Sequence, residues 1–254
     1  MRSTLAPIRY REDALLSVAV NVTAWRFIPP KPGEVSLKSL EFGGAAPTVT
    51  SPPPPDETHA RPSRIIGIAA STGGPGALRR LLTGLPASFP AAILVVQHIA
   101  DGFEEGFAEW LDTFTGMTVK VASARMRLRD GLVLLSGADR HLGLGPGSRA
   151  ELSNAPPVCG HRPSATHLFD SLANHGGRDT IGIVLTGMGD DGVDGLVALH
   201  RAGAEILAQD EASSIVYGMP GAAVASGSVD AILPIDAIRA RLIEQAVAHR
   251  APVG

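Results

Sequence analysis

The chain has 254 residues, of which 44% are hydrophobic and 19% charged, and its formal net charge is −3. This length fits one α/β domain of about 150–200 residues with an extension. The mild acidity excludes the basic footprint of a nucleic-acid or anionic-membrane binder. The single cysteine, Cys159, excludes an intramolecular disulfide and a thiolate metal cluster and fits a reducing cytoplasm.

The first 63 residues differ in composition from the rest of the chain. Ten of the 20 prolines lie in residues 1–62, including four in a row at 52–55, and residues 29–64 show little apolar periodicity. Proline-rich chain favours extended, poorly packed conformations. We therefore predict a largely unstructured tail and linker over 1–63 and a folded domain over 64–250.

From residue 64 onward, short apolar runs alternate with helical stretches, which is typical of βαβ units. The runs are mostly continuous, as expected for parallel strands buried on both faces. The predicted strands cover 65–70, 92–97, 118–121, 181–186, 205–208 and 231–233, and the predicted helices cover 76–85, 104–114, 164–175, 192–202 and 235–249. Between 128 and 152, Gly-rich turns separate runs at 132–135 and 141–144, which predicts a small antiparallel ribbon on the edge of the sheet. The predicted fold is a doubly wound, mostly parallel α/β sheet flanked by helices.

Ser71 follows the first predicted strand, within the run Ser-Thr-Gly-Gly-Pro at 71–75, and a helix is predicted directly after it. Its hydroxyl is therefore expected at the carboxyl edge of the sheet, where open α/β sheets bind ligands and the first helical amides can hold an oxyanion. Gly73 and Gly74 leave room for a substrate to approach the backbone. Taken alone, this segment also fits a serine N-cap or a phosphate-binding turn.

Two further predicted strands lead to polar residues at the same edge. His98 ends the apolar run at 93–97, and the run at 181–186 leads to Asp190 and Asp191 within Gly-Met-Gly-Asp-Asp-Gly at 187–192. An isolated histidine at a strand end also fits a structural role. A serine, a histidine and an aspartate on one edge, however, supply the nucleophile, the base and the orienting acid of a catalytic triad.

Two other functions fit parts of this pattern. The carboxylates at 190–191 fit a metal loop, although EF-hand spacing is absent and two adjacent carboxylates make a poor cage, so we expect no metal. The turn at 71–74 fits a non-catalytic phosphate- or nucleotide-binding module, which is the alternative function. It lacks a second phosphate-binding lysine or a ribose-binding acid at the expected spacing. The chain order Ser, His, Asp and the absence of G-x-S-x-G disfavour an ordinary lipase or esterase.

Over roughly residues 64–249 the sequence strongly resembles the catalytic domain of the chemotaxis protein-glutamate methylesterases. Six short motifs carry the resemblance, and their order along the chain makes it specific. They are Ala-Ser-Thr-Gly-Gly at 70–74, Gln-His at 97–98, His-Arg-Pro-Ser at 161–164, Leu-Thr-Gly-Met-Gly-Asp-Asp-Gly at 185–192, Glu-Ala-Ser-Ser at 211–214 and Gly-Met-Pro at 218–220.

The resemblance implies specific roles for residues of the site. Ser71 is the implied nucleophile, His98 the general base and Asp191, rather than Asp190, the orienting acid. The Met188 amide is an implied oxyanion donor, and Thr72 and Gly73 lie in the turn that contacts the substrate. Arg162 is expected either to line the entrance for an anionic receptor side chain or to form a surface ion pair.

The resemblance also implies a substrate and partners. The substrate is a glutamyl methyl ester on the helical signalling domain of a chemoreceptor, hydrolysed without a cofactor to glutamate and methanol through an acyl-enzyme. Glutamine deamidation is compatible with the same site. Relatives commonly carry a receiver domain ahead of the linker, and residues 1–63 are too short and Pro-rich to form one. A separate response regulator is thus a candidate partner. We expect a cytoplasmic protein without membrane insertion or nucleic-acid binding.

Overall fold

The structure is a computed structural model that describes residues 61–250, so almost all of the predicted tail over 1–63 lies outside the described residues. The predicted folded domain begins with β1 (Ile65–Ala70). Among residues 61–250, no helix is long and apolar enough to cross a membrane.

Seven strands form one sheet, and every pairing in it is parallel. The order across the sheet is β3-β4-β2-β1-β7-β8-β9. The other strands of this sheet are β2 (Ala92–Gln97), β3 (Thr118–Val121), β4 (Leu132–Leu135), β7 (Thr180–Val184), β8 (Glu205–Gln209) and β9 (Ala231–Leu233). This sheet confirms the predicted doubly wound fold.

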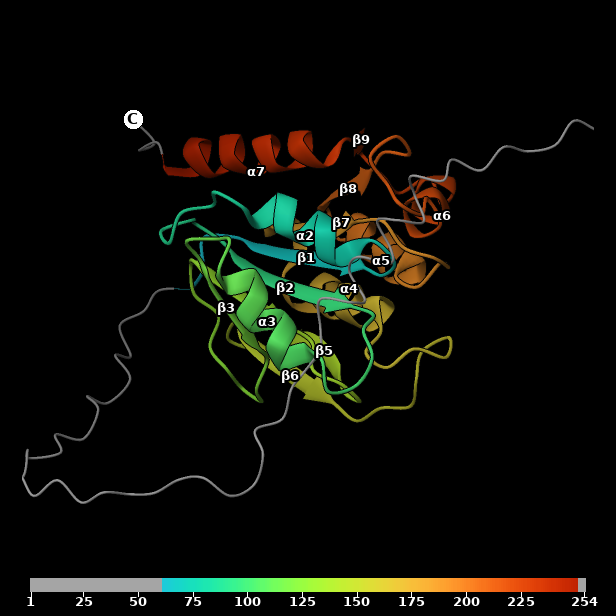
Figure 1. Cartoon of the computed structure of the whole chain (residues 1–254), viewed down its shortest axis with the longest axis horizontal. Coiled ribbons are helices and arrows are strands. Elements are labelled where there is room, and N and C mark those ends of the chain that lie inside the picture. The colour runs from blue at the N-terminus through green and yellow to red at the C-terminus, as the bar shows by residue number, and fades with distance from the viewer. Residues whose placement is uncertain (1–60, 251–254) are drawn as a thin grey trace, which may run out of the picture. The chain divides into compact units, whose positions relative to one another are not determined.

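Helices cover both faces of the sheet (Figure 1). Side chains of α2 (Gly74–Leu82), α3 (Glu104–Asp112) and α7 (Ile235–Arg250) belong to the core cluster on one face. Side chains of α4 (Ala165–His175), α5 (Val193–Arg201) and α6 (Met219–Ala225) belong to the cluster on the other. A short 3-10 helix, η1 (Gly177–Asp179), leads into β7.

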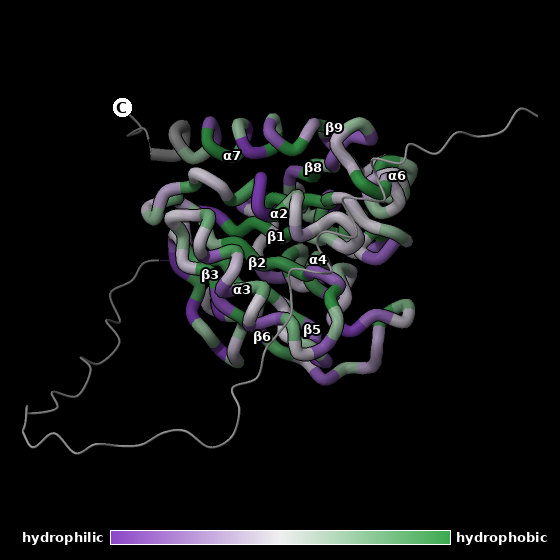
Figure 2. Tube along the Cα trace, in the orientation of Figure 1, coloured by the Kyte–Doolittle hydropathy of each residue, from purple (hydrophilic) through white to green (hydrophobic). Residues whose placement is uncertain are grey.

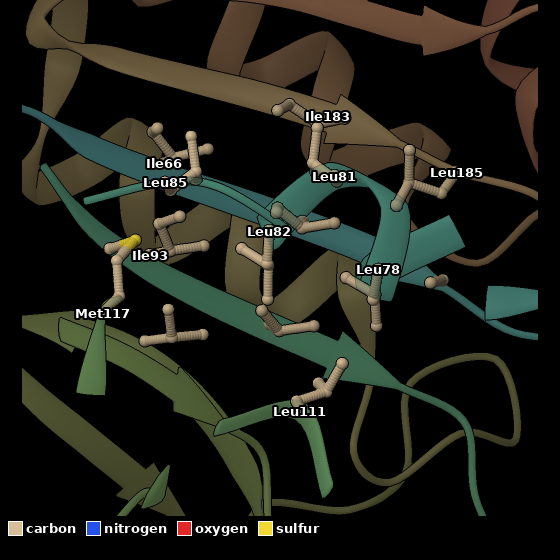
Figure 3. Close-up of a cluster of buried hydrophobic side chains, with 14 of the residues drawn as sticks. Ile66, Leu78, Leu81, Leu82, Leu85, Ile93, Leu111, Met117, Ile183 and Leu185 are labelled. Carbon is tan, nitrogen blue, oxygen red and sulfur yellow. The ribbon is translucent and has the colours of Figure 1, made fainter. Parts of the chain in front are cut away.

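The central strands contribute side chains to both clusters, because successive side chains of a strand point to opposite faces. In β1, Ile66 and Ile68 enter the first cluster, whereas Ile65 and Ala69 enter the second. Figure 2 shows the apolar strands lying between helices of mixed hydropathy, and Figure 3 shows the first cluster filling the space between the sheet and α2. Burial of each large side chain contributes roughly 1.5–3 kcal/mol to folding. The packed core therefore stabilises the central strands β1, β2 and β7, whose carboxyl ends carry the site.

A glycine in β1 brings α4 close to the sheet. A Cβ atom at Gly67 would lie 2.3 Å from Leu172 Cδ1 and 3.2 Å from Phe169 Cε1 of α4, so these side chains would have to shift to admit it. The glycine therefore leaves room for the Leu172 and Phe169 side chains of α4 against β1. The amino end of α4 contributes to the site described below.

The region at 128–152 differs in part from the prediction. The predicted ribbon exists as a separate two-stranded antiparallel sheet of β5 (His141–Gly145) and β6 (Arg149–Ser153), and β5 packs against α4. The run at 132–135 is not part of it: as β4 it inserts between β2 and β3 in the main sheet. Its four residues are all buried, which suits a parallel strand covered on both faces and not an edge ribbon.

Candidate active site

Ser71, His98 and Asp191 lie at the carboxyl edge of three neighbouring strands. Strand β1 carries Ser71 at its end, with β2 on one side and β7 on the other. The chain passes from β1 to β2 in one direction and later returns to the opposite side of β1 with β7. This reversal is the switch point at which open α/β sheets bind their ligands, so the fold brings the three predicted residues to one place.

The Ser71 turn is held between the two neighbouring strands. Ser71 N donates to Thr186 O at 3.1 Å, and Gly74 N donates to Ser71 O at 2.8 Å. Gly73 has a φ of 81°, in the left-handed region that favours glycine. On the β7 side, a Cβ atom at Gly187 would lie 2.9 Å from Ser71 Cβ. The 187–189 loop can therefore lie directly against the serine only because residue 187 is a glycine.

Gln97 ties the serine turn to the histidine turn. Its Nε2 donates to both Ser71 O and His98 O, each at 2.9 Å, and the residue is 4% exposed. A Cβ atom at Gly74 would lie 1.9 Å from Gln97 Oε1, so Gly74 makes the space that the amide fills. Because Ala70 pairs with Gln97 in the register of β1 and β2, Ser71 and His98 are the next residues out on the two strands.

His98 and Asp191 form the pair that a triad needs. His98 Nε2 lies 2.9 Å from Asp191 Oδ2, with 17% of the histidine side chain and 1% of the aspartate side chain exposed. This bond leaves Nδ1 as the imidazole nitrogen available to a hydroxyl. Within residues 61–250, the Ser71 hydroxyl makes no hydrogen bond. Catalytic hydrogen bonds are often long or poorly aligned in unliganded sites, so the missing bond does not exclude His98 as the base for Ser71.

The amino end of α4 cradles the Asp191 carboxylate. Oδ1 accepts from Ser164 Oγ at 2.7 Å and from Thr166 N and Oγ1 at 3.2 Å each, and Oδ2 accepts from Ala165 N at 2.7 Å. Burial alone raises the pKa of Asp191. The hydrogen bonds from His98 and from residues 164–166 outweigh burial and hold this pKa well below its ordinary value. Asp191 therefore stays ionised and can stabilise an imidazolium at His98.

Three backbone amides beside Ser71 are free to stabilise an oxyanion. Within the described part of the chain, the N–H groups of Thr72, Gly73 and Met188 have no hydrogen-bond acceptor. Thr72 and Gly73 lie in the turn before α2, and Met188 follows the glycine that contacts Ser71. The Met188 amide predicted as an oxyanion donor and the two amides of the serine turn are thus unpaired beside Ser71, and their role as donors stays a prediction.

The remaining predicted residues, Asp190 and Arg162, lie at the periphery. Asp190 is exposed, and its side chain makes no hydrogen bond within residues 61–250. Arg162 pairs with the exposed Asp139, with Nε 3.0 Å from Oδ1, and its Nη1 donates to Ala155 O at 3.4 Å. This is the surface ion pair that the sequence left open, and substrate contact by Arg162 stays a prediction.

Four residues that contact the triad or its turns are not among those predicted from the sequence. Gln97, His161 and Ser164 lie inside the motifs that carry the resemblance but received no role, and Thr166 was not singled out. The His161 ring stacks on His98 with centroids 4.5 Å apart and an interplanar angle of 4°. The adjacency of Gln97 to His98 was the available signal for one of them. The others lie at least 25 residues from their partners along the chain.

A serine, a histidine paired with an ionised aspartate, and unpaired backbone amides are the groups from which a serine hydrolase site is built. A family model described as CheB methylesterase matches residues 66–242. The chain therefore belongs to the CheB methylesterase family.

Named relatives and a solved structure agree with this membership. The chain is 50% identical over 193 residues to protein-glutamate methylesterase/protein-glutamine glutaminase 3 of Anaeromyxobacter dehalogenans (strain 2CP-C), covering 76% of this chain and 56% of the relative. It is 50% identical over 203 residues to protein-glutamate methylesterase/protein-glutamine glutaminase 4 of Myxococcus xanthus (strain DK1622), covering 77% and 57%. The crystal structure of the Thermotoga maritima CheB methylesterase catalytic domain is 34% identical with a TM-score of 0.69, and the match covers 72% of this chain and 98% of that one. The chain spans a little over half the length of the curated relatives it matches.

Proposed function

We propose that this chain hydrolyses glutamyl methyl esters on the signalling helices of chemoreceptors, releasing glutamate and methanol, and acts in chemotaxis adaptation in the cytoplasm. The observation that carries the proposal is the 2.9 Å bond between His98 and the buried Asp191, one strand away from Ser71. The relatives' names pair methylesterase with glutaminase activity. We extend the proposal to glutamine deamidation, because both reactions pass through the same acyl-enzyme.

In the first half of the reaction, Ser71 Oγ attacks the ester carbonyl carbon and His98 Nδ1 takes the hydroxyl proton. Asp191 accepts from the Nε2–H of the imidazolium and so fixes its tautomer and stabilises its charge. The carbonyl oxygen becomes an oxyanion, and the amides of Thr72, Gly73 and Met188 are its donors. The carbon–oxygen bond to methoxide then breaks, and the His98 proton leaves with it as methanol.

In the second half, water replaces methanol. His98 takes a proton from the water as the hydroxide attacks the glutamyl–Ser71 ester, and the same amides hold the second oxyanion. Collapse breaks the bond to Ser71 Oγ, which recovers its proton from His98. The products are the glutamate carboxylate and a regenerated serine, so no group outside the chain and water is needed.

The test is methanol release from a methylated receptor by the full chain and by Ser71→Ala. Wild type should release methanol, and the variant should fall to background. Retention of more than about a tenth of wild-type activity would contradict the assignment, because it corresponds to a barrier change of only about 1.4 kcal/mol.

A second measurement separates the proposal from the phosphate-binding alternative. An active-site-directed phosphonate should label Ser71 in wild type and lose that label in His98→Ala, because a serine in a phosphate cradle has no base to activate it. Labelling that is absent, or indifferent to His98, would favour the binding module.

A further inference from the structure

His161 is the side chain beside the triad to which the proposed chemistry gives no task. Its ring lies flat against His98, with centroids 4.5 Å apart. Within residues 61–250, neither ring nitrogen of His161 makes a hydrogen bond, although its backbone is tied to Val158 by bonds of 2.9 and 3.0 Å. Two unused imidazole nitrogens therefore stand next to the base.

His98, His161 and Asp191 each offer a metal-ligating atom, and these atoms all lie within 4.8 Å of one another. Zinc binds imidazole nitrogen at about 2.0–2.1 Å and carboxylate oxygen at about 2.0–2.2 Å in tetrahedral geometry, which separates neighbouring ligands by about 3.3 Å. The His98–Asp191 pair, now 2.9 Å apart, would need to open by only a few tenths of an ångström. The larger adjustment falls on His161. Its ring must turn out of the stack, and its ligating nitrogen must come up to about 1.5 Å closer to the other two ligand atoms.

The ligand set selects zinc over the hard cations. Two imidazoles and one carboxylate with a fourth position for water is a common zinc arrangement, whereas Mg²⁺ and Ca²⁺ prefer oxygen ligands throughout. The Asp191 carboxylate is already oriented from behind by Ser164, Ala165 and Thr166. Loss of groups that hydrogen-bond a metal ligand in this way typically lowers metal affinity by about 10–100-fold.

We propose that His98, His161 and Asp191 form an inhibitory zinc site. The ion takes the place of the proton between His98 Nε2 and Asp191 Oδ2, and His161 supplies the third ligand. In this state His98 cannot become an imidazolium paired with Asp191, so Ser71 has no working base. The inhibition rests on the proposed function, whereas the metal site does not.

The binding test uses the full chain, stripped of metal and titrated with Co²⁺ as a spectroscopic probe and with Zn²⁺ by calorimetry. We expect wild type to show the visible absorption of tetrahedral Co²⁺, displaced by Zn²⁺. His161→Asn removes a direct ligand, so it should weaken binding at least about tenfold, since even outer-shell changes reach that size. His200→Asn is the matched control, because His200 also lies near a carboxylate, 3.4 Å from Asp230, and it should bind like wild type.

Cys159 needs its own control, because this exposed thiol lies two residues from His161 and thiolates bind zinc strongly. Cys159→Ser should keep the full cobalt spectrum. Loss of the spectrum in Cys159→Ser, unchanged binding in His161→Asn, or no saturable binding to wild type would each overturn the proposed site.

The inhibition test measures ester hydrolysis against zinc concentration, with each variant normalised to its own metal-free rate. Wild type should lose activity as zinc saturates the site and recover with a chelator, and His161→Asn should need at least about tenfold more zinc. Zinc that binds at the site without slowing wild type would overturn the inhibitory role. A protein that binds zinc as expected but releases no methanol would instead refute the proposed function alone.

Discussion

The fold holds the three triad residues and the neighbouring His161 in different ways. Ser71, His98 and Asp191 follow the buried strands β1, β2 and β7 within one to seven residues. His161 lies on the segment 154–163, which is held by turn hydrogen bonds, by the bond between buried His141 Nε2 and Pro156 O at 3.1 Å, and by the pair of Arg162 with exposed Asp139. The residues assigned to the chemistry are thus mounted on the ends of sheet strands, whereas the third ligand of the proposed zinc site is mounted on a loop.

The largest expected effect tests whether the sheet-mounted residues act as one unit. Ser71→Ala and His98→Ala should each lower kcat by about 10⁶-fold while leaving the thermal unfolding midpoint nearly unchanged. The double variant should be no worse than either single variant, because losses within a triad do not add. Fully multiplicative losses in steady-state kinetics would show that the two residues act independently.

The next effect compares two adjacent carboxylates. Asp191→Asn should cost about 10⁴-fold in kcat, which is the size of the loss when the orienting carboxylate of a serine protease triad is replaced by its amide. Asp190→Asn should stay within about threefold, because Asp190 is exposed and holds no part of the site. Equal losses from both substitutions, or rescue by a divalent metal, would favour the metal loop instead.

A smaller effect concerns the residue that joins two of the sheet-mounted turns. Gln97→Leu removes the amide that donates to the carbonyls of Ser71 and His98. Because a shift of about 1 Å at a reacting group can cost about 10²-fold, we expect kcat to fall about 10–100-fold with KM nearly unchanged.

The control for Gln97 is Gln245→Leu, since Gln245 bonds Arg64 and Glu205 near the amino ends of β1 and β8. It should change kcat by less than about twofold. A Gln97→Leu variant that unfolds at lower temperature but turns over normally would make Gln97 a purely structural residue.

The smallest expected effect lies in the Pro-rich segment 1–63. A poorly packed tail would lose conformational entropy on docking, so it should inhibit weakly or not at all. Its removal should change turnover on saturating receptor by less than about threefold, which is under about 1 kcal/mol in barrier. A large activation on truncation, or an effect of acetyl phosphate, would show that this segment regulates the enzyme.

The sequence by itself determined the alternation of strands and helices and the three residues at strand ends. Continuous apolar runs such as 65–70 and 92–97 identify buried strands from the sequence alone, and a polar residue directly after such a run must lie at the edge of the sheet. These features depend on neighbours along the chain, so they can be read without the fold.

The tertiary structure alone decided which strands are neighbours and what surrounds each reactive group. The run at 132–135 pairs with β2 and β3 in the main sheet, and its four residues are buried there. The local sequence pattern does not encode this choice of neighbours. Asp191 accepts hydrogen bonds from residues 25–27 positions away at the amino end of α4, and His98 stacks on the His161 ring, which lies on a loop 63 residues further along the chain. Hydrogen bonds and ring contacts act over a few ångströms in space, and only the packing of α4 and the 154–163 segment on the sheet brings these partners within that range.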